Sequence, residues 1–218
     1  MTSKWLDLSH DFFEGMPYNK LLGPPKIEPV YTLEDHLFQI TRYTFLTHFG
    51  THMDAPNHFI RGGKSIDQIP PDQTAGPAVV LNLPKPPCAE ITVADLEKAT
   101  PKVQRGDIVF LRTGWGAKFQ EEDYHDHPYL SGESAKWLVD SGAKMVGVDF
   151  ITVDLPPQLR EKGFACPAHT TLLGNDVLIL ENVYLEEVAG KRLEVFCFPI
   201  KIRGADGAPT RVMAQAKG

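Results

Sequence analysis

The stretch Thr47-His48-Phe49-Gly50-Thr51-His52-Met53-Asp54-Ala55-Pro56-Asn57-His58 places three histidines and an aspartate within eleven residues. Neutral imidazole and carboxylate groups are good donors to Zn²⁺ or Mn²⁺, and the absence of cysteine here argues against a structural thiolate zinc site. His48, His52 and Asp54 would leave coordination positions open for water, whose pKa a bound divalent ion lowers toward about 7. His58 is close enough to exchange protons without being a ligand. The stretch therefore predicts a catalytic metal site.

The spacing of these four residues also predicts the path of the chain. All four positions are even-numbered, so an extended chain directs their side chains to one face. A helix cannot hold them, because Gly50 and Pro56 interrupt it. Fully extended, the segment would span roughly 33 Å, whereas the ligands of one ion lie about 2.0–2.2 Å from it. We therefore expect bends at Gly50 and at Ala55-Pro56-Asn57.

Beyond this stretch, short apolar runs recur that are typical of buried strands. Each run is rich in β-branched residues and is bounded by Gly, Pro, Asn or Asp, and the runs cover residues 78–83, 107–112, 145–150 and 177–182. A further run over 195–202 contains Pro199, which predicts an edge strand or a bulge there.

Fewer segments favour helices. Thr92 can cap a helix over 93–99, with Asp95 in its first turn, where the helix dipole favours a carboxylate. A second helix is predicted over 131–141, followed by Gly142, and a short third one over 167–173, ended by Gly174. Strands outnumber helices and the order is mixed, so the predicted class is α/β or α+β, with a β-rich core and a few packing helices.

The composition excludes several classes of protein. The 218 residues are 42% hydrophobic and 23% charged, which is ordinary for a globular protein, and no linker divides them, so we expect a single domain over 1–218. A net charge of −6 without Lys/Arg clusters argues against nucleic-acid and membrane partners. The N-terminal residues lack an apolar run and no apolar segment approaches roughly 20 residues, so we expect neither a signal peptide nor a membrane-spanning helix. Three cysteines without paired spacing favour a reducing, cytoplasmic location.

The opening stretch resembles the signature H-x-G-T-H-x-D-x-P-x-H of the cyclase family of metal-dependent hydrolases, which includes bacterial kynurenine formamidases and isatin hydrolases. All its fixed positions are matched, by His48, Gly50, Thr51, His52, Asp54, Pro56 and His58. Further similar segments run along most of the chain, at residues 5–9, 110–115, 147–154, 179–183 and 204–211. The resemblance implies that the β-rich core has the swivelling β/β/α-type fold.

The resemblance also implies a centre for two divalent ions, Zn²⁺ or Mn²⁺. By position, His48, His52 and Asp54 would hold the first ion, and Asp54 would bridge to the second. His169 would bind the second ion, and Glu181 would reach both. From the residues alone, Glu181 closes an apolar run, where a charge is costly unless paired or liganded. His169 alone is typical of an ordinary core or surface histidine.

The implied activity is hydrolysis of an amide-type C–N bond in a small aromatic or cyclic substrate, with His58 as proton donor and acceptor. In kynurenine formamidases a Trp of the N-terminal loop lies against the aryl ring. The corresponding loop here reads Gly15-Met16-Pro17-Tyr18-Asn19-Lys20, so we expect Tyr18 to bind substrate in its place. Opening of a cyclic amide, as by isatin hydrolases, and a cyclase or lyase reaction on another small molecule are the alternatives. The resemblance further implies a homodimer or higher homo-oligomer.

The sequence does not assign four other polar residues to the metal site. Asp149 and Asp154 flank a loop after a predicted strand, where they either orient a ligand histidine or cap a turn. His125 and His127 lie in the polar run 121–127, which favours a solvated loop.

Overall fold

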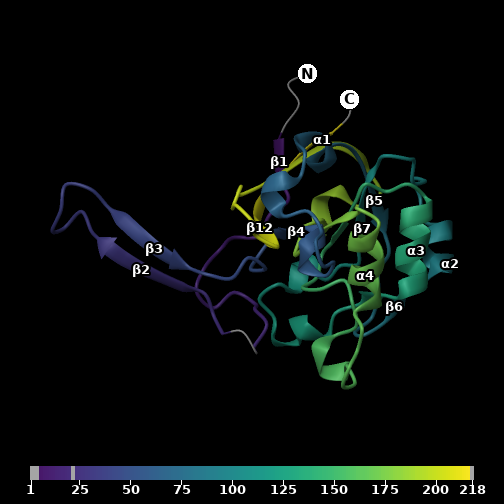
Figure 1. The fold of residues 1–218 in the computed structure, drawn as a ribbon, viewed down its shortest axis with the longest axis horizontal. Coiled ribbons are helices and arrows are strands. Elements are labelled where there is room, and N and C mark those ends of the chain that lie inside the picture. The colour runs from purple at the N-terminus through teal and green to yellow at the C-terminus, as the bar shows by residue number, and fades with distance from the viewer. Residues whose placement is uncertain (1–4, 21–22, 217–218) are drawn as a thin grey trace.

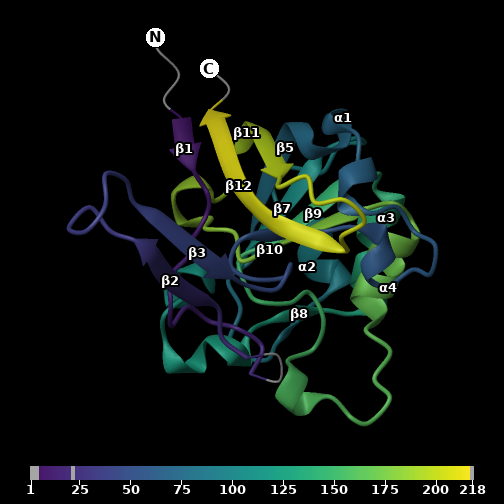
Figure 2. The same cartoon turned by 60° about the vertical axis from the view of Figure 1, so that its left-hand side comes forward.

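The computed structural model describes residues 5–20 and 23–216. Within them, seven strands close into a barrel-like ring, because β4 (His52–Asp54), at the end of the sheet order, pairs again with β12 (Gly207–Ala216). In ring order these are β12, β11 (Arg192–Pro199), β5 (Ala75–Asn82), β7 (Ile108–Arg112), β9 (Met145–Val148), β10 (Leu178–Glu181) and β4. The first strand, β1 (Trp5–Asp7), lies beside β12 (Figure 2). The four strands β5, β7, β9 and β10 run parallel, and the other pairings are antiparallel.

The parallel strands are buried on both faces, which explains their continuous apolar runs. In β7, Val109 and Leu111 point to one hydrophobic cluster, and Ile108 and Phe110 point to the other. All four predicted runs form strands, and so does the run around Pro199. The prediction of an edge at Pro199 is confirmed locally. Strand β11 lies between β5 and β12, but its pairing with β5 ends at Phe196, so Pro199, its last residue, pairs with β12 alone.

Three helices cover one side of the sheet (Figure 1). They are α2 (Val93–Lys98), α3 (Gly132–Asp140) and α4 (Pro167–Gly174), which confirms the three predicted helices, and a single turn, α1 (Pro71–Thr74), precedes β5. Thr92 caps α2 by accepting a hydrogen bond from the Asp95 backbone. Short 3-10 turns are η1 (Pro56–His58), η2 (Ile66–Gln68), η3 (Gly116–Lys118), η4 (Glu122–Asp126), η5 (Pro157–Leu159) and η6 (Glu186–Val188). Among the described residues, the helices are too short and too polar to span a bilayer.

A hairpin that the sequence did not predict projects from the body of the molecule (Figure 1). Its strands, β2 (Lys26–Tyr31) and β3 (Ile40–Thr44), pair only with each other, and another small pair joins β6 (Glu90–Ile91) to β8 (Tyr129–Leu130). The hairpin exposes large apolar side chains, including Leu37, which is 99% exposed, and Phe38, which is 53% exposed. A two-stranded hairpin without a packing partner is marginally stable in water.

Candidate metal centre

Two bends fold the His48–His58 stretch around one point, as its spacing predicts. Gly50 adopts a left-handed φ of 61°, which costs glycine little, and the second bend is the 3-10 turn η1 at Pro56. Strand β4 lies between the bends and carries His52 and Asp54, both buried. The stretch thus returns on itself and brings its four polar side chains together.

Strand pairing brings Glu181 to the same place. Strand β10 runs antiparallel to β4, with Glu181 opposite His52, so its carboxylate emerges beside the imidazole. Helix α4 contributes His169, which is also buried. The structure therefore unites all five residues that the family resemblance implies as metal ligands: His48, His52, Asp54, His169 and Glu181.

Four distances at this cluster have the length expected between ligands of a common ion. His52 Nε2 lies 3.3 Å from Asp54 Oδ1 and 3.4 Å from Glu181 Oε2. His169 Nε2 lies 3.5 Å from Asp54 Oδ2 and 3.3 Å from Glu181 Oε1. Ligands about 2.1 Å from an ion at tetrahedral angles are about 3.4 Å apart. Each carboxylate thus offers one oxygen to the His52 side and the other to the His169 side.

The hydrogen bonding leaves atoms of His52 and Asp54 free to bind a metal ion. His52 Nε2 and Asp54 Oδ2 are buried, and neither has a hydrogen-bond partner within the described residues. The other nitrogen of His52, Nδ1, donates to the carbonyl oxygen of Gly50 at 2.8 Å, so Nε2 keeps its lone pair. Such a partner on the second ring nitrogen is typical of metal-binding histidines. The residues present fit a divalent cation.

Charges in the cluster hold one another in their ionised forms. Burial opposes protonation of His52, but the neighbouring carboxylates of Asp54 and Glu181 outweigh it and raise its pKa to about 10. Burial and the charge of Asp54 likewise oppose ionisation of Glu181, but the neighbouring His169 and His52 outweigh them and lower its pKa to about 2. Without a cation, protons on the histidines balance the carboxylates, so a metal must compete with protons for this site.

Asp206 belongs to the site and was not singled out from the sequence. Its Oδ2 lies 3.0 Å from His48 Nε2 and 3.3 Å from His58 Nδ1, and its Oδ1 accepts a hydrogen bond from Thr47. The signal available was its place in the segment 204–211, where it was read only as part of a family match. His48 Nδ1 lies 2.7 Å from Asp54 Oδ1, so His48 connects Asp206 with the buried carboxylate.

The start of β12 approaches His48 so closely that only glycine fits. A Cβ at Gly207 would lie 2.7 Å from the Met53 carbonyl oxygen and 2.8 Å from Cε1 of His48. This contact holds the His48 ring between β12 and the ring of His58, whose centroid is 3.9 Å away.

A cavity of about 850 Å³ opens onto the cluster. His48, His58, His169, Glu181 and Asp206 line one part of it. Tyr18 is not among the lining residues, although its neighbours Pro17 and Asn19 are. Its ring lies 6.4 Å from that of Phe49 and packs against the core.

The structure gives Asp154 and Asp149 different roles. Asp154 accepts hydrogen bonds from the Ala168 and His169 backbones and lies 2.5 Å from His169 Nδ1. Asp149 instead accepts from the Thr113 side chain and from backbone N–H groups of residues 113–115. Asp154 therefore contacts a candidate ligand, and Asp149 holds a turn.

The expectation of a solvated loop is wrong for His127. Its side chain is fully buried and stacks on Phe150, and its Nδ1 lies 2.7 Å from the Pro128 carbonyl oxygen. Burial lowers its pKa to about 4. The polar residues around His127 gave no indication in the sequence that its side chain is buried. His125 is half-buried and lines the cavity.

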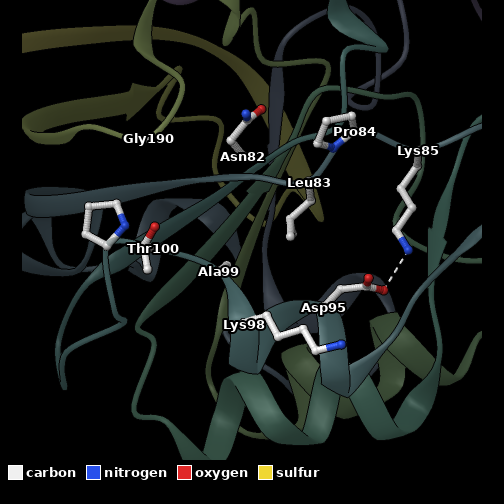
Figure 3. Close-up of a pocket in the computed structure, with 10 residues that line it drawn as sticks. Asn82, Leu83, Pro84, Lys85, Asp95, Lys98, Ala99, Thr100 and Gly190 are labelled. Carbon is white, nitrogen blue, oxygen red and sulfur yellow. Dashed lines mark hydrogen bonds and ion pairs between the residues drawn. The ribbon is translucent and has the colours of Figure 1, made fainter.

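A second cavity, of about 630 Å³, lies between the end of β5 and α2 (Figure 3). Lys85 and Asp95 form an ion pair there at 2.6 Å. Neither a histidine nor any member of the cluster described above lines it. The donor groups for a metal thus lie at the first cavity.

Comparisons with known proteins agree with this geometry. The model of the family described as "Putative cyclase" matches residues 6–155. The kynurenine formamidase of Bacillus anthracis is 30% identical over 214 residues, 97% of each chain, and that of Erythrobacter litoralis (strain HTCC2594) is 32% identical over 174 residues, 80% of this chain and 76% of the relative. Isatin hydrolase A from Ralstonia solanacearum superposes with a TM-score of 0.87 at 25% identity, covering 99% of this chain and 92% of that one. A structure described as a potential metal-dependent hydrolase with cyclase activity matches all of both chains with a TM-score of 0.82 at 26% identity. Together with the His, Asp and Glu cluster, these matches show that the chain belongs to the cyclase family of metal-dependent hydrolases.

Proposed function

We propose that this amide hydrolase of the cyclase family cleaves the formyl C–N bond of a small aryl formamide. The observation that carries the proposal is the placement of the Asp54 and Glu181 carboxylates. Each points one oxygen toward His52 and the other toward His169, at 3.3–3.5 Å. Curated relatives of nearly the same length are kynurenine formamidases, which supports a formamide as the substrate.

The proposed centre holds two divalent ions, Zn²⁺ or Mn²⁺. His48, His52 and Asp54 would hold the first, His169 would hold the second, and Asp54 and Glu181 would contact both. The buried atoms without partners, His52 Nε2 and Asp54 Oδ2, support this assignment. Bound there, the ions would polarise the amide carbonyl and lower the pKa of a water.

His58 is the proposed proton carrier. Burial lowers its pKa from 6.5, and His48 and His169 lower it further against the opposing charge of Asp54, so the imidazole is neutral at pH 7 and can accept a proton. Asp206, 3.3 Å from Nδ1, orients the ring and leaves Nε2 for the reaction. His58 takes a proton from the attacking water, whose oxygen bonds to the formyl carbon. As the C–N bond breaks, His58 returns the proton to the leaving nitrogen, and formate and an arylamine result.

A side-by-side assay tests the reaction. We expect the metal-loaded protein to release formate from N-formylkynurenine and to lose this activity with a chelator. Ring opening of isatin, without deformylation, would favour the second candidate, a cyclic amide hydrolase, which the likeness to isatin hydrolase A supports. Metal binding with neither activity would instead favour a cyclase or lyase reaction.

Three further expectations remain proposals. Tyr18 would contact the substrate only if its ring turned from Phe49 into the adjoining cavity, and a raised KM in Tyr18→Ala would reveal it. A homodimer is supported by the apolar side chains exposed on the β2–β3 hairpin, and light scattering measures it. A single domain over 1–218 in the cytoplasm is supported by the closed sheet and by three free cysteines.

A further inference from the structure

Arg160 lines the cavity on the loop that leads into α4. Contacts with three residues of the same loop fix the position of its guanidinium. Nε donates to the Leu155 carbonyl oxygen at 2.6 Å, Nη1 lies 3.8 Å from Cys166 Sγ, and the group sits 5.4 Å from the centre of the Phe164 ring. A half-buried arginine held in this way is pre-organised to bind a second group with its remaining N–H donors.

The remaining donors of Arg160 have no carboxylate to bind. Within the described residues, no Asp or Glu oxygen lies within 4 Å of the guanidinium, and Nη2 has no hydrogen-bond partner. Besides Glu181 and Asp206 at the metal centre, two acidic residues line the cavity, Glu122 and Asp126, and Asp126 accepts a hydrogen bond from Gln158 at 2.8 Å. A second cation, Lys20, also lines the cavity. The cavity therefore offers an unpaired guanidinium, away from the carboxylates of the metal centre.

The spacing suits one small molecule. Arg160 touches Cys166, which immediately precedes α4, and His169 lies three residues later in the first turn of that helix. One helical turn rises about 5 Å, so Cys166 and His169 are separated by about that distance along the helix. A molecule with a carboxylate at one end and a scissile amide at the other can reach the guanidinium and the metal centre together. Arginine is suited to the first task, because its planar fork matches a carboxylate.

We infer that Arg160 binds a carboxylate of the substrate, so that the site selects aryl formamides that carry a carboxylate over those that lack one. This inference rests on the proposed function and adds a carboxylate on the substrate to it. Arg160 thereby fixes the end of the molecule remote from the C–N bond, and it acts on binding rather than on the chemical step.

Binding measurements on the metal-loaded protein test the inference without requiring turnover. Calorimetry compares kynurenine with its carboxamide, which differs only in lacking the carboxylate. We expect wild type to bind kynurenine more tightly. Arg160→Gln should lose about 10-fold or more of that affinity, as for a hydrogen bond to a charged group, and should bind the carboxamide as wild type does. Arg160→Lys should recover part of the loss, and Arg203→Gln, which changes an exposed arginine, should resemble wild type.

Kinetics supply the second readout. For N-formylkynurenine, Arg160→Gln should raise KM and leave kcat nearly unchanged, and for neutral formanilide both constants should stay the same. Equal weakening of acid and carboxamide, no weakening of either, or a wild type that binds neither would overturn the inference. Hydrolysis of formanilide by that same wild type would show that the proposed function still stands, whereas its absence would count against the proposed function itself.

Discussion

Asp154 Oδ2 lies 2.5 Å from Nδ1 of His169 and also accepts the backbone N–H of the same residue. One carboxylate therefore fixes both the start of α4 and the orientation of the His169 ring, with Nε2 turned toward Asp54 and Glu181. The Asp154 carboxylate also helps to raise the pKa of His169 well above its ordinary value against the effect of burial. A partner of this kind makes the imidazole a stronger metal ligand.

Removal of the Asp154 charge should weaken the second metal site. Asp154→Asn keeps the size of the side chain and an acceptor oxygen, but it no longer stabilises the polarised ring. We expect a 10- to 100-fold loss, roughly, of metal affinity, measured by competition with a chromogenic chelator. Asp140→Asn changes an exposed aspartate of α3 and should leave the affinity unchanged. Wild-type affinity in Asp154→Asn would show that this contact does not tune the ligand.

Loss of His58 should separate metal binding from turnover. His58→Ala removes the proposed proton carrier and leaves the five proposed ligands in place. The variant should keep its bound metal and lose about 100- to 10,000-fold in kcat, as determined by metal analysis and formate release on one preparation. If metal is lost together with activity, His58 is a ligand and the roles at the site must be reassigned.

Gly207 should tolerate no side chain. In Gly207→Ala the new Cβ would meet the Met53 carbonyl oxygen and the His48 ring, and overpacking of this kind costs about 1–3 kcal/mol of unfolding free energy. Metal content should fall because His48 is displaced. Gly174→Ala is the matched control, since its Cβ would lie 3.6 Å from Ile60, an ordinary contact. Equal stability and metal content in the two variants would contradict the close approach of β12.

His127 should make the fold sensitive to acid. Its pKa is about 4 in the folded protein because burial disfavours the charged ring, against 6.5 for an ordinary histidine. Between these values the unfolded chain binds more protons, so stability is complete above pH 6.5 and falls as the pH drops toward 4. The difference corresponds to about 3 kcal/mol. Urea unfolding at pH 7 and pH 4.5 measures it, and the use of metal-free protein avoids a contribution from the loss of bound metal.

His127→Gln removes one titrating group and should reduce this pH dependence, even though its stability at pH 7 is lower; His10, whose pKa burial also lowers to about 4, keeps its own share. The exposed His36 offers a matched control, since His36→Gln should retain the wild-type slope. A wild-type slope in His127→Gln would mean that other groups cause the acid sensitivity.

The parts of the fold that could be predicted are those whose local pattern has one physical reading. The runs that became β5, β7, β9 and β10 are apolar on both faces, and Thr92 and Gly142 mark helix ends. The hairpin from Lys26 to Thr44 has no such pattern, because neither of its faces is buried. The closure of the sheet could not be predicted either, since the pairing of β4 with β12 joins residues far apart in the chain.

The same limit applies to the site. The local part, His48 to His58, follows from residue types and from bends that Gly50 and Pro56 allow. His169 and Glu181 came only from the family resemblance, because each reaches the cluster through tertiary structure. Asp206 was missed since an aspartate before a glycine is typical of a turn, and its contact with His58 spans 148 residues.

Anomalous diffraction from crystals of the metal-loaded protein, recorded on both sides of the zinc and manganese absorption edges, tests the two-ion centre most directly. We predict two ions in each chain, about 3.5–4 Å apart. One should contact His52 and the other His169, with Asp54 and Glu181 contacting both. A single fully occupied ion, or ions held by other residues, would contradict the centre proposed for this hydrolase.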